Sequence, residues 1–291
     1  MGPGHSVRSR QPAFDAAMED KRMAHPQLGV SLHAISPEPS DAVLEAIDGS
    51  AVATLEVMDR LVQEGTPDLR ARLAAFVQHS RVRVATIHAQ FGQAYDISSP
   101  DATIRREGLA AVHGAVDTAI DLGAPMIVVH ASAEPILPEE RAARLRRAEA
   151  ALQDLGARCA EAGVRVAIEL LPRTCLGNTV DELRTLLDGL PEAVFGVCLD
   201  TNHLMDRARD LAHVPGALGN RLLTLHMSDY DGVDEQHQMP GLGVLDWQAF
   251  MRALEQAGYA GPYNYECHIE GGTPQDRIEA LENNWRWLSA L

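Results

Sequence analysis

The chain contains a series of side chains that can bind a divalent metal ion. Each ends a short apolar segment, and successive members are one strand and one helix apart: Glu169, Asp200, His226 and Glu266. Three carboxylates and one imidazole form a hard, oxygen-rich ligand set, which favours Mn²⁺, Mg²⁺ or Co²⁺ over a thiolate-bound zinc ion. We therefore expect one divalent metal ion here, with Mn²⁺ as the first choice and Mg²⁺, Co²⁺ or Zn²⁺ as alternatives.

The clearest part of this pattern lies between Phe195 and Tyr230. Two apolar segments of strand length, GVCLD and LLTLH, end at Asp200 and His226, and a short amphipathic helix is expected between them. A parallel α/β barrel builds its active site from side chains at the carboxyl ends of its strands. Other strands of the chain should therefore end in the same way.

Eight predicted strands do end at or near a residue that can bind metal or transfer protons. These residues are His33, Glu56, His88, His130, Glu169, Asp200, His226 and Glu266. Side chains alternate between the two faces of a strand, so the small Thr224 shares a face with His226 while the bulky Leu225 occupies the other. We expect the eight polar side chains to converge on the mouth of a barrel.

Each of these residues, taken alone, has a simpler explanation. A single strand-end histidine such as His33 is usually a hydrogen-bonded structural residue, and a single glutamate such as Glu56 often caps the following loop. The metal site is favoured by the recurrence of ligand types at the ends of four successive strands.

Strands and helices alternate from residue 27 to the end of the chain. The strands are expected at 28–33, 53–58, 82–89, 125–131, 164–171, 195–200, 222–227 and 263–267. The helices between them carry apolar stripes, the longest running from Leu145 to Ala162. Strict alternation favours a closed barrel over an open sheet, and no GxGxxG motif follows the first strand. The predicted fold class is α/β, a single (β/α)₈ TIM barrel.

We expect the chain to consist of a leader and one domain. Residues 1–25 mix glycine, proline and charge without periodicity and are expected to form a flexible N-terminal leader. Residues 26–291 are expected to form the catalytic barrel domain, because no linker-like segment divides them.

Composition limits the classes of partner. The net charge of −16, with 41 acidic against 25 basic residues, argues against nucleic acid. Lys21 is the single lysine, so the barrel holds none for a Schiff base. The four cysteines lie far apart, which is typical of reduced thiols in the cytoplasm, and no apolar run is long enough to suggest a membrane span. We expect a cytoplasmic protein with neither nucleic acid nor membrane as its partner.

The same residues resemble a known superfamily. The four ligand residues, the segment DTNH at 200–203 and the segment HMSDYDGVDEQHQMPGLGVLDW at 226–247 are similar to the xylose isomerase-like TIM barrels, in particular the sugar phosphate isomerase/epimerase group. The segment LLPRTCLGNT at 170–179 is also similar. The resemblance covers the chain from about residue 27 to its end.

The resemblance implies a metal-dependent isomerase or epimerase that acts on a small carbohydrate. In that group one divalent ion is held by four such residues, and Glu169 and Glu266 also move protons. One glutamate removes the proton α to the substrate carbonyl, giving a metal-stabilised enediolate, and the other returns a proton. The residues expected to contact the substrate are His88, His130, Arg173, His203, Asp229 and His237. Similar proteins are often dimers or tetramers, so a homo-oligomer is expected.

Some of these assignments have alternatives. His203 could instead ligate a second ion, and Arg173 could be a surface or loop-pairing arginine. The segment GGT at 271–273 could bind an anion at a helix N-terminus, but it more simply forms a turn and a cap. No Gly-rich phosphate loop is evident after the last two strands, and Gly232 stands where some ketose epimerases carry a substrate-binding arginine.

Two other functions share much of this pattern. A dehydratase or lyase acting on an inosose or a 3-keto sugar uses the same first step, the removal of an α-proton, and then expels a β-substituent. A barrel that only binds a ligand is also conceivable, but such a protein is expected to have lost Glu169 or Glu266, and both are present.

The third alternative is an endonuclease IV-like abasic-site nuclease with three zinc ions. Additional histidines stand where its extra ligands would be: His88, His130, His203 and His237. Against it, the Asp-x-His motif of that family is Glu-Gln-His at 235–237, and its lysine-bearing loop is missing. The negative net charge also opposes binding to a phosphate backbone.

Overall fold

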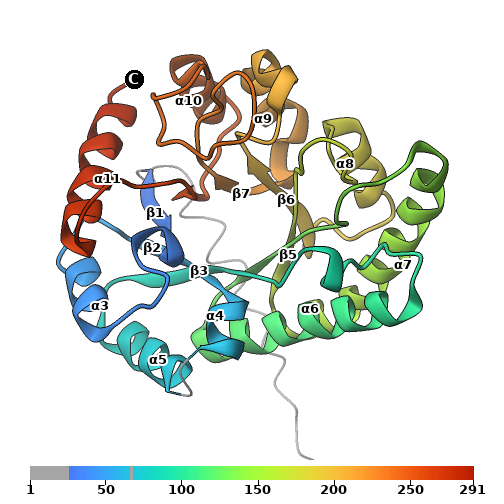
Figure 1. The fold of residues 1–291 in the computed structure, drawn as a ribbon, viewed down its shortest axis with the longest axis horizontal. Coiled ribbons are helices and arrows are strands. Elements are labelled where there is room, and N and C mark those ends of the chain that lie inside the picture. Colours follow the sequence, from blue (N-terminus) through green and yellow to red (C-terminus); the bar gives the residue numbers. More distant parts are fainter. Residues whose placement is uncertain (1–25, 66–67) are drawn as a thin grey trace, which may run out of the picture.

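Eight parallel strands form the centre of the molecule and are surrounded by helices (Figure 1). The computed structural model describes residues 26–65 and 68–291, so the predicted leader at 1–25 lies outside the described residues. The strands follow one another in the order β7-β6-β5-β4-β3-β2-β1-β8. A parallel bridge between Met227 and Tyr265 joins the two edge strands and closes the sheet. The predicted (β/α)₈ TIM barrel is confirmed.

All eight predicted strands are present, most of them shorter than expected. They are β1 (Gln27–Ser31), β2 (Thr54–Met58), β3 (Arg83–His88), β4 (Met126–Val129), β5 (Arg165–Glu169), β6 (Phe195–Asp200), β7 (Leu222–His226) and β8 (Pro262–Tyr265). The first strand ends two residues earlier than expected, at Ser31, and a helical turn follows. His33 therefore lies on that turn and not at a strand end, which corrects the prediction for this residue.

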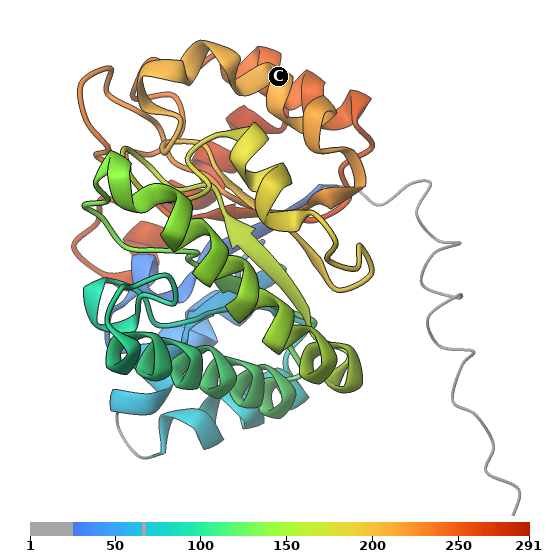
Figure 2. The ribbon, with the colours of Figure 1, turned by 90° about the vertical axis from the view of Figure 1, so that its right-hand side faces the viewer.

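The helices cover the outside of the barrel. They are α2 (Leu32–Ile35), α3 (Asp41–Asp48), α4 (Asp59–Glu64), α5 (Leu69–His79), α6 (Ala102–Leu122), α7 (Pro138–Ala162), α8 (Val180–Leu187), α9 (Val214–Leu218), α10 (Trp247–Gln256) and α11 (Pro274–Leu288), with 3₁₀ turns η1 (Gln93–Tyr95), η2 (Met205–His213) and η3 (Gly219–Arg221). Figure 2 shows the two longest, α6 and α7, side by side. The helical segment expected before β7 is formed by η2 and α9.

Local sequence signals explain where several helices begin and end. Asp101 accepts hydrogen bonds from the backbone N–H groups of Thr103 and Ile104 and so caps α6. Gly163 ends α7 with a φ of 68°, a left-handed conformation that costs glycine little. Thr273 and Asp276 form a capping box at the start of α11, so the GGT segment is a turn and cap.

The two faces of the sheet pack differently. Ile168, Leu225 and Tyr265 point outwards and are fully buried against the helices. On the inner face, Val128 and Ala167 belong to a smaller, separate cluster of buried side chains. Because side chains alternate along a strand, this cluster lies one layer below the polar residues at the strand ends. The polar ends of these strands thus lie above a packed layer of apolar side chains.

Two predictions made from the composition concern the cysteines and a membrane span. All four cysteines are free and buried, in agreement with a packing role. Among residues 26–65 and 68–291, no helix is long and apolar enough to cross a membrane.

A buried ion pair holds the loops that follow β3 and β4. Arg144 of α7 pairs with Asp96, and both side chains are almost fully buried. The guanidinium also donates to Ser98 Oγ at 3.2 Å and to the carbonyl of Ala133 at 3.3 Å. These contacts fix backbone next to the rim of the barrel mouth.

Asp96→Ala should lower the free energy of unfolding by about 3–5 kcal/mol, because it leaves the Arg144 charge buried without a partner. Chemical denaturation of the purified protein measures this change. The double variant Asp96→Ala/Arg144→Met should recover much of the loss, since neither charge remains. A loss below about 1 kcal/mol for the single variant would contradict the role given to this pair.

Candidate active site

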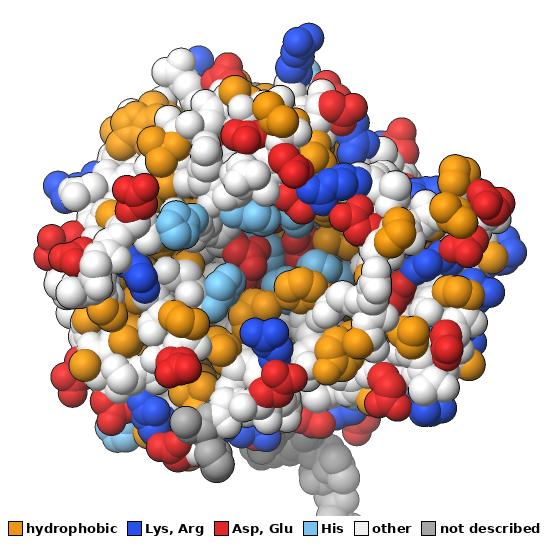
Figure 3. Space-filling model, in the orientation of Figure 1, with side chains coloured by type: hydrophobic (Ala, Val, Ile, Leu, Met, Phe, Trp, Pro, Cys, Tyr) orange, Lys and Arg blue, Asp and Glu red, His pale blue; other side chains and the backbone are white. Residues whose placement is uncertain are grey.

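A cavity of about 700 Å³ opens at the carboxyl ends of the strands. Figure 3 shows it as a hollow in which histidine and carboxylate side chains gather. Its polar lining residues include His33, His88, Gln93, His130, Glu134, Glu169, His203, Glu235, His237, Glu266, His268 and Arg277. Such a cavity is large enough for a small organic ligand.

The four predicted metal ligands lie close together, and two of them, Glu169 and Glu266, line this cavity. Glu169, Asp200 and His226 are the last residues of β5, β6 and β7, and Glu266 directly follows β8. Each offers one ligand atom, and these atoms all lie within 4.8 Å of one another. Glu169, Asp200 and His226 are almost completely buried, whereas the side chain of Glu266 is 16% exposed. The parallel register brings residues far apart in the sequence to one place.

Two buried atoms of this group have no hydrogen-bond partner. They are Nδ1 of His226 and Oδ2 of Asp200. His226 Nδ1 lies 2.6 Å from Oε2 of Glu266, but the geometry of the contact is not that of a hydrogen bond. Because buried polar atoms are nearly always paired, these two atoms are available as ligands of a cation. The oxygen-rich donor set fits a divalent ion.

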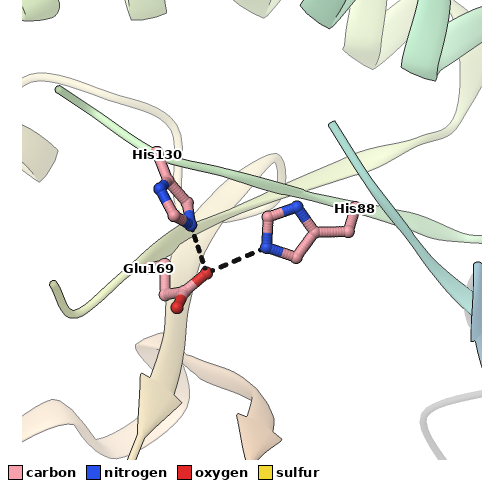
Figure 4. Close-up of side chains that lie close together, drawn as sticks. All are labelled: His88, His130 and Glu169. Atoms are coloured by element: carbon pink, nitrogen blue, oxygen red, sulfur yellow. Dashed lines mark hydrogen bonds and ion pairs between the residues drawn. The ribbon is translucent and has the colours of Figure 1, made fainter. Parts of the chain in front are cut away.

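Glu169 also contacts two histidines of the cavity wall (Figure 4). Its Oε2 atom accepts hydrogen bonds from Nε2 of His130 at 3.0 Å and of His88 at 3.2 Å. Burial lowers the pKa of His88, but the hydrogen bond and negative charge of Glu169 outweigh it and raise that pKa to about 9. Burial lowers the pKa of His130 below its usual value. His88 and His130 therefore hold Glu169 as well as line the cavity.

The two catalytic candidates are kept in their ionised forms. Burial raises the pKa of Glu169, but the neighbouring imidazoles of His130 and His226 bring that pKa well below its usual range. Burial also raises the pKa of Glu266, but the charge of His226 outweighs it and lowers that pKa below its usual range. An ionised carboxylate has a lone pair that can accept a proton, so both residues are available as bases.

His203 and His237 form the next part of the wall. His203 Nδ1 lies 3.0 Å from the carbonyl of Leu170 and 3.4 Å from Oε1 of Glu169. Its Nε2 lies 3.4 Å from Oε2 of Glu235. His203, Glu235 and His237 are close enough to hold a cation of their own. Both predicted histidines thus face the cavity, and the alternative of a second ion at His203 stays open.

Arg173 does not line the cavity. Its guanidinium lies 3.0 Å from Glu134 and 2.7 Å from Glu235, and it also pairs with Asp234. These partners belong to the loops that follow β4 and β7. The structure therefore shows Arg173 in the loop-pairing arrangement, with the charge of its guanidinium shared among three carboxylates.

Asp229 was also expected to contact the substrate, but its position in the structure does not favour such a contact. The residue is fully buried and does not line the cavity. Its carboxylate accepts hydrogen bonds from the backbone N–H groups of Gly241 and Leu245, at 2.8 and 3.1 Å, and from Nε1 of Trp247 at 2.7 Å. Because both oxygens are occupied, Asp229 folds the loop after β7 and has no oxygen left for a ligand.

Sequence reasoning missed one residue of the cavity wall and misplaced one carboxylate. Phe91 lies in the loop after β3, and its ring centroid is 4.4 Å from that of His130. It is 47% exposed and lines the cavity, but a lone aromatic residue in a loop carries no periodic signal. Glu56 was expected at a strand end, whereas it lies inside β2 and is completely buried.

The chain is a closed barrel of eight parallel strands, which is a TIM barrel. Its candidate site, a cluster of carboxylates and imidazoles, lies at the carboxyl ends of the strands, where enzymes of this fold have their active sites. A family model described as xylose isomerase-like TIM barrel matches residues 43–291. The chain belongs to this family.

Individual relatives are distant. The chain is 26% identical over 228 residues to a ketose 3-epimerase of Arthrobacter globiformis, covering 77% of this chain and 76% of that protein. An uncharacterised protein of Sinorhizobium fredii, y4fM, is 27% identical over 184 residues, covering 62% of this chain and 57% of that protein. Among solved structures, 3-keto-D-glucoside 4-epimerase YcjR from E. coli has a TM-score of 0.76 at 20% identity, covering 91% of this chain and 100% of that chain.

A divalent metal should stabilise the protein. Protein treated with a chelator and then given Mn²⁺ at about a hundredfold excess over Kd should gain about 2.7 kcal/mol of stability, because the ion binds only the folded state. Differential scanning calorimetry detects this as a rise in Tm. Asp200→Asn should reduce the rise, since it removes one ligand charge. No rise in Tm with Mn²⁺, Mg²⁺, Co²⁺ or Zn²⁺ would contradict the metal site.

Proposed function

We propose that this chain is a divalent-metal-dependent sugar isomerase or epimerase, with residues 26–291 as its catalytic domain and a small carbohydrate as its substrate. The observation that carries the proposal is the placement of two ionised carboxylates, Glu169 and Glu266, in one ligand group at the bottom of the cavity. Membership of the xylose isomerase-like family and similarity to a ketose 3-epimerase support the same reaction class.

The chemistry follows from the residues that surround the cavity. A bound divalent ion would polarise the carbonyl of the sugar and stabilise the negative charge that develops on its oxygen. Glu169, Asp200, His226 and Glu266 would hold this ion. Mn²⁺ remains the metal that we propose, because the donor set is mainly oxygen.

Glu169 and Glu266 would move the protons. One carboxylate accepts the proton from the carbon next to the carbonyl, and the other returns a proton to the carbon that has lost it. Glu266 is the more exposed of the two, whereas Oε2 of Glu169 is already held by His88 and His130. The two residues therefore differ in how easily they reach a substrate. We assign the first proton removal to Glu266 for this reason.

A dehydratase or lyase remains the closest alternative, because it needs the same first step. A nuclease with several metal ions is less well supported. The groups His88–His130–Glu169 and His203–Glu235–His237 could hold further cations. The wall of the cavity, however, carries a further carboxylate, that of Glu134, which counts against a phosphate-containing substrate. Carboxylates at the mouth repel a phosphate backbone.

Deuterium exchange tests the proposal directly. The Mn²⁺-loaded protein would be incubated in D₂O with a panel of ketoses, inososes and 3-keto sugars, and each mixture would be followed by NMR. We expect deuterium at the carbon next to a carbonyl, together with an epimer or isomer of the substrate. An unsaturated or dehydrated product would identify a lyase. No exchange with any member of the panel, together with three zinc ions per chain, would favour the nuclease.

Glu169→Gln and Glu266→Gln should each lower kcat by at least about a thousandfold, because an amide cannot accept the proton. Circular dichroism and Tm should show that both variants fold. Glu192→Gln is a matched control, since this glutamate lies on the surface and pairs only weakly with Arg221, at 3.8 Å; its kcat should match the native value. Turnover by either of the first two variants within tenfold of the native rate would contradict the two-carboxylate mechanism.

A further inference from the structure

Glu56 is a buried carboxylate that the proposed reaction does not use. It lies in the middle of β2, is completely buried and does not line the cavity. A buried carboxylate costs several kcal/mol unless it is paired and hydrogen-bonded. An apolar residue at this position of the barrel interior would avoid that cost, so the presence of a charge calls for an explanation.

Three hydrogen bonds reach the Glu56 carboxylate from side chains of three other strands. Thr86 Oγ1 on β3 donates to Oε2 at 2.9 Å. Asn264 Nδ2 on β8 donates to Oε1 at 3.3 Å. Nε2 of His226, the last residue of β7, lies 2.9 Å from Oε2. The three partners come from different strands, so the carboxylate is held in one position.

The third contact decides which nitrogen of His226 is free. An ionised carboxylate can only accept hydrogen bonds, so Nε2 must carry the proton. In a neutral ring that binds a metal, the other nitrogen, Nδ1, is then the one that offers its lone pair. Nδ1 is the buried atom without a hydrogen-bond partner, and it lies 2.6 Å from Oε2 of Glu266 and 3.5 Å from Oε1 of Glu169.

We propose that Glu56 is the positioning residue of the metal site. Its carboxylate holds His226 through Nε2–H, fixes the ring orientation, and directs Nδ1 towards Glu169, Asp200 and Glu266. A carboxylate in this position also makes the imidazole a stronger ligand, as it does in other metal sites in which a histidine has such an outer partner. The inference rests on the metal site of the proposed function, but it assigns a role to a residue outside the four ligands.

The competing explanation is that Glu56 only stabilises the fold. Two kinds of variant separate the alternatives. Glu56→Leu removes the hydrogen bonds and the charge, whereas Glu56→Gln keeps a similar shape and an oxygen that can accept from His226. Asp59→Asn is the matched control, because Asp59 is also completely buried and lies on α4, outside the barrel, where it accepts a hydrogen bond from Thr118 at 2.7 Å.

The test measures Mn²⁺ binding and not turnover. The Kd of the full-length protein for Mn²⁺, obtained by competition with a chelator, should rise about 10–100-fold in Glu56→Leu and by a smaller factor in Glu56→Gln. Asp59→Asn should keep the native Kd. A Kd within twofold of the native value in a folded Glu56→Leu variant would overturn the proposal.

A second measurement uses the native chain and so does not depend on whether a variant folds. In ¹⁵N-histidine-labelled protein loaded with Zn²⁺, NMR should show that His226 carries its proton on Nε2 and binds the metal through Nδ1. The opposite assignment would overturn the role of Glu56 while leaving the proposed sugar reaction intact. If the native protein binds no divalent metal, the metal-dependent function fails, and the role of Glu56 fails with it.

Discussion

The site depends on the compensation of negative charge among carboxylates that are largely buried. Four carboxylates, those of Glu56, Glu169, Asp200 and Glu266, surround the imidazole of His226. Burying several like charges together is unfavourable unless hydrogen bonds or cations offset it. Neighbouring histidines supply part of this compensation, and a divalent cation held by the proposed ligand group would supply the rest.

Carboxylates of the same chemical type have different roles because their surroundings differ. Glu56 has donors at both oxygens and no access to solvent, so it can orient a neighbour but cannot reach a substrate. Glu169 is shared between the ligand group and two histidines of the wall. Glu266 is partly exposed to the cavity. The local environment of each carboxylate, more than its residue type, thus determines whether it orients a neighbour or transfers protons.

Buried carboxylates also shape the loops around the cavity. Asp229 gathers N–H donors from the loop after β7, and Asp96 pairs with Arg144 beside the loop after β3. Arg173 connects loops that follow three different strands. Some of the acidic residues therefore have a structural role inside the protein, and the excess of acidic residues is not confined to the surface. The rigid barrel supplies the strand ends, and these contacts hold the rim in place above them.

The sequence by itself predicted the barrel and grouped four residues as candidate metal ligands. Strand-length apolar segments, each followed by an amphipathic helix, have a spacing that a closed parallel barrel satisfies. Glu169, Asp200, His226 and Glu266 end successive strands, and the carboxyl ends of parallel strands meet at one edge. Both signals are local or periodic, so they can be recognised without coordinates.

The tertiary structure alone decided the tasks of the other polar residues. Asp229 and Arg173 stand in the same kind of loop as His237, and only the three-dimensional contacts show that the first two are occupied by protein partners. Glu56 and His226 lie far apart in the sequence and meet inside the barrel. Hydrogen bonds between such distant residues depend on the register and twist of the whole sheet, and no local sequence pattern encodes them.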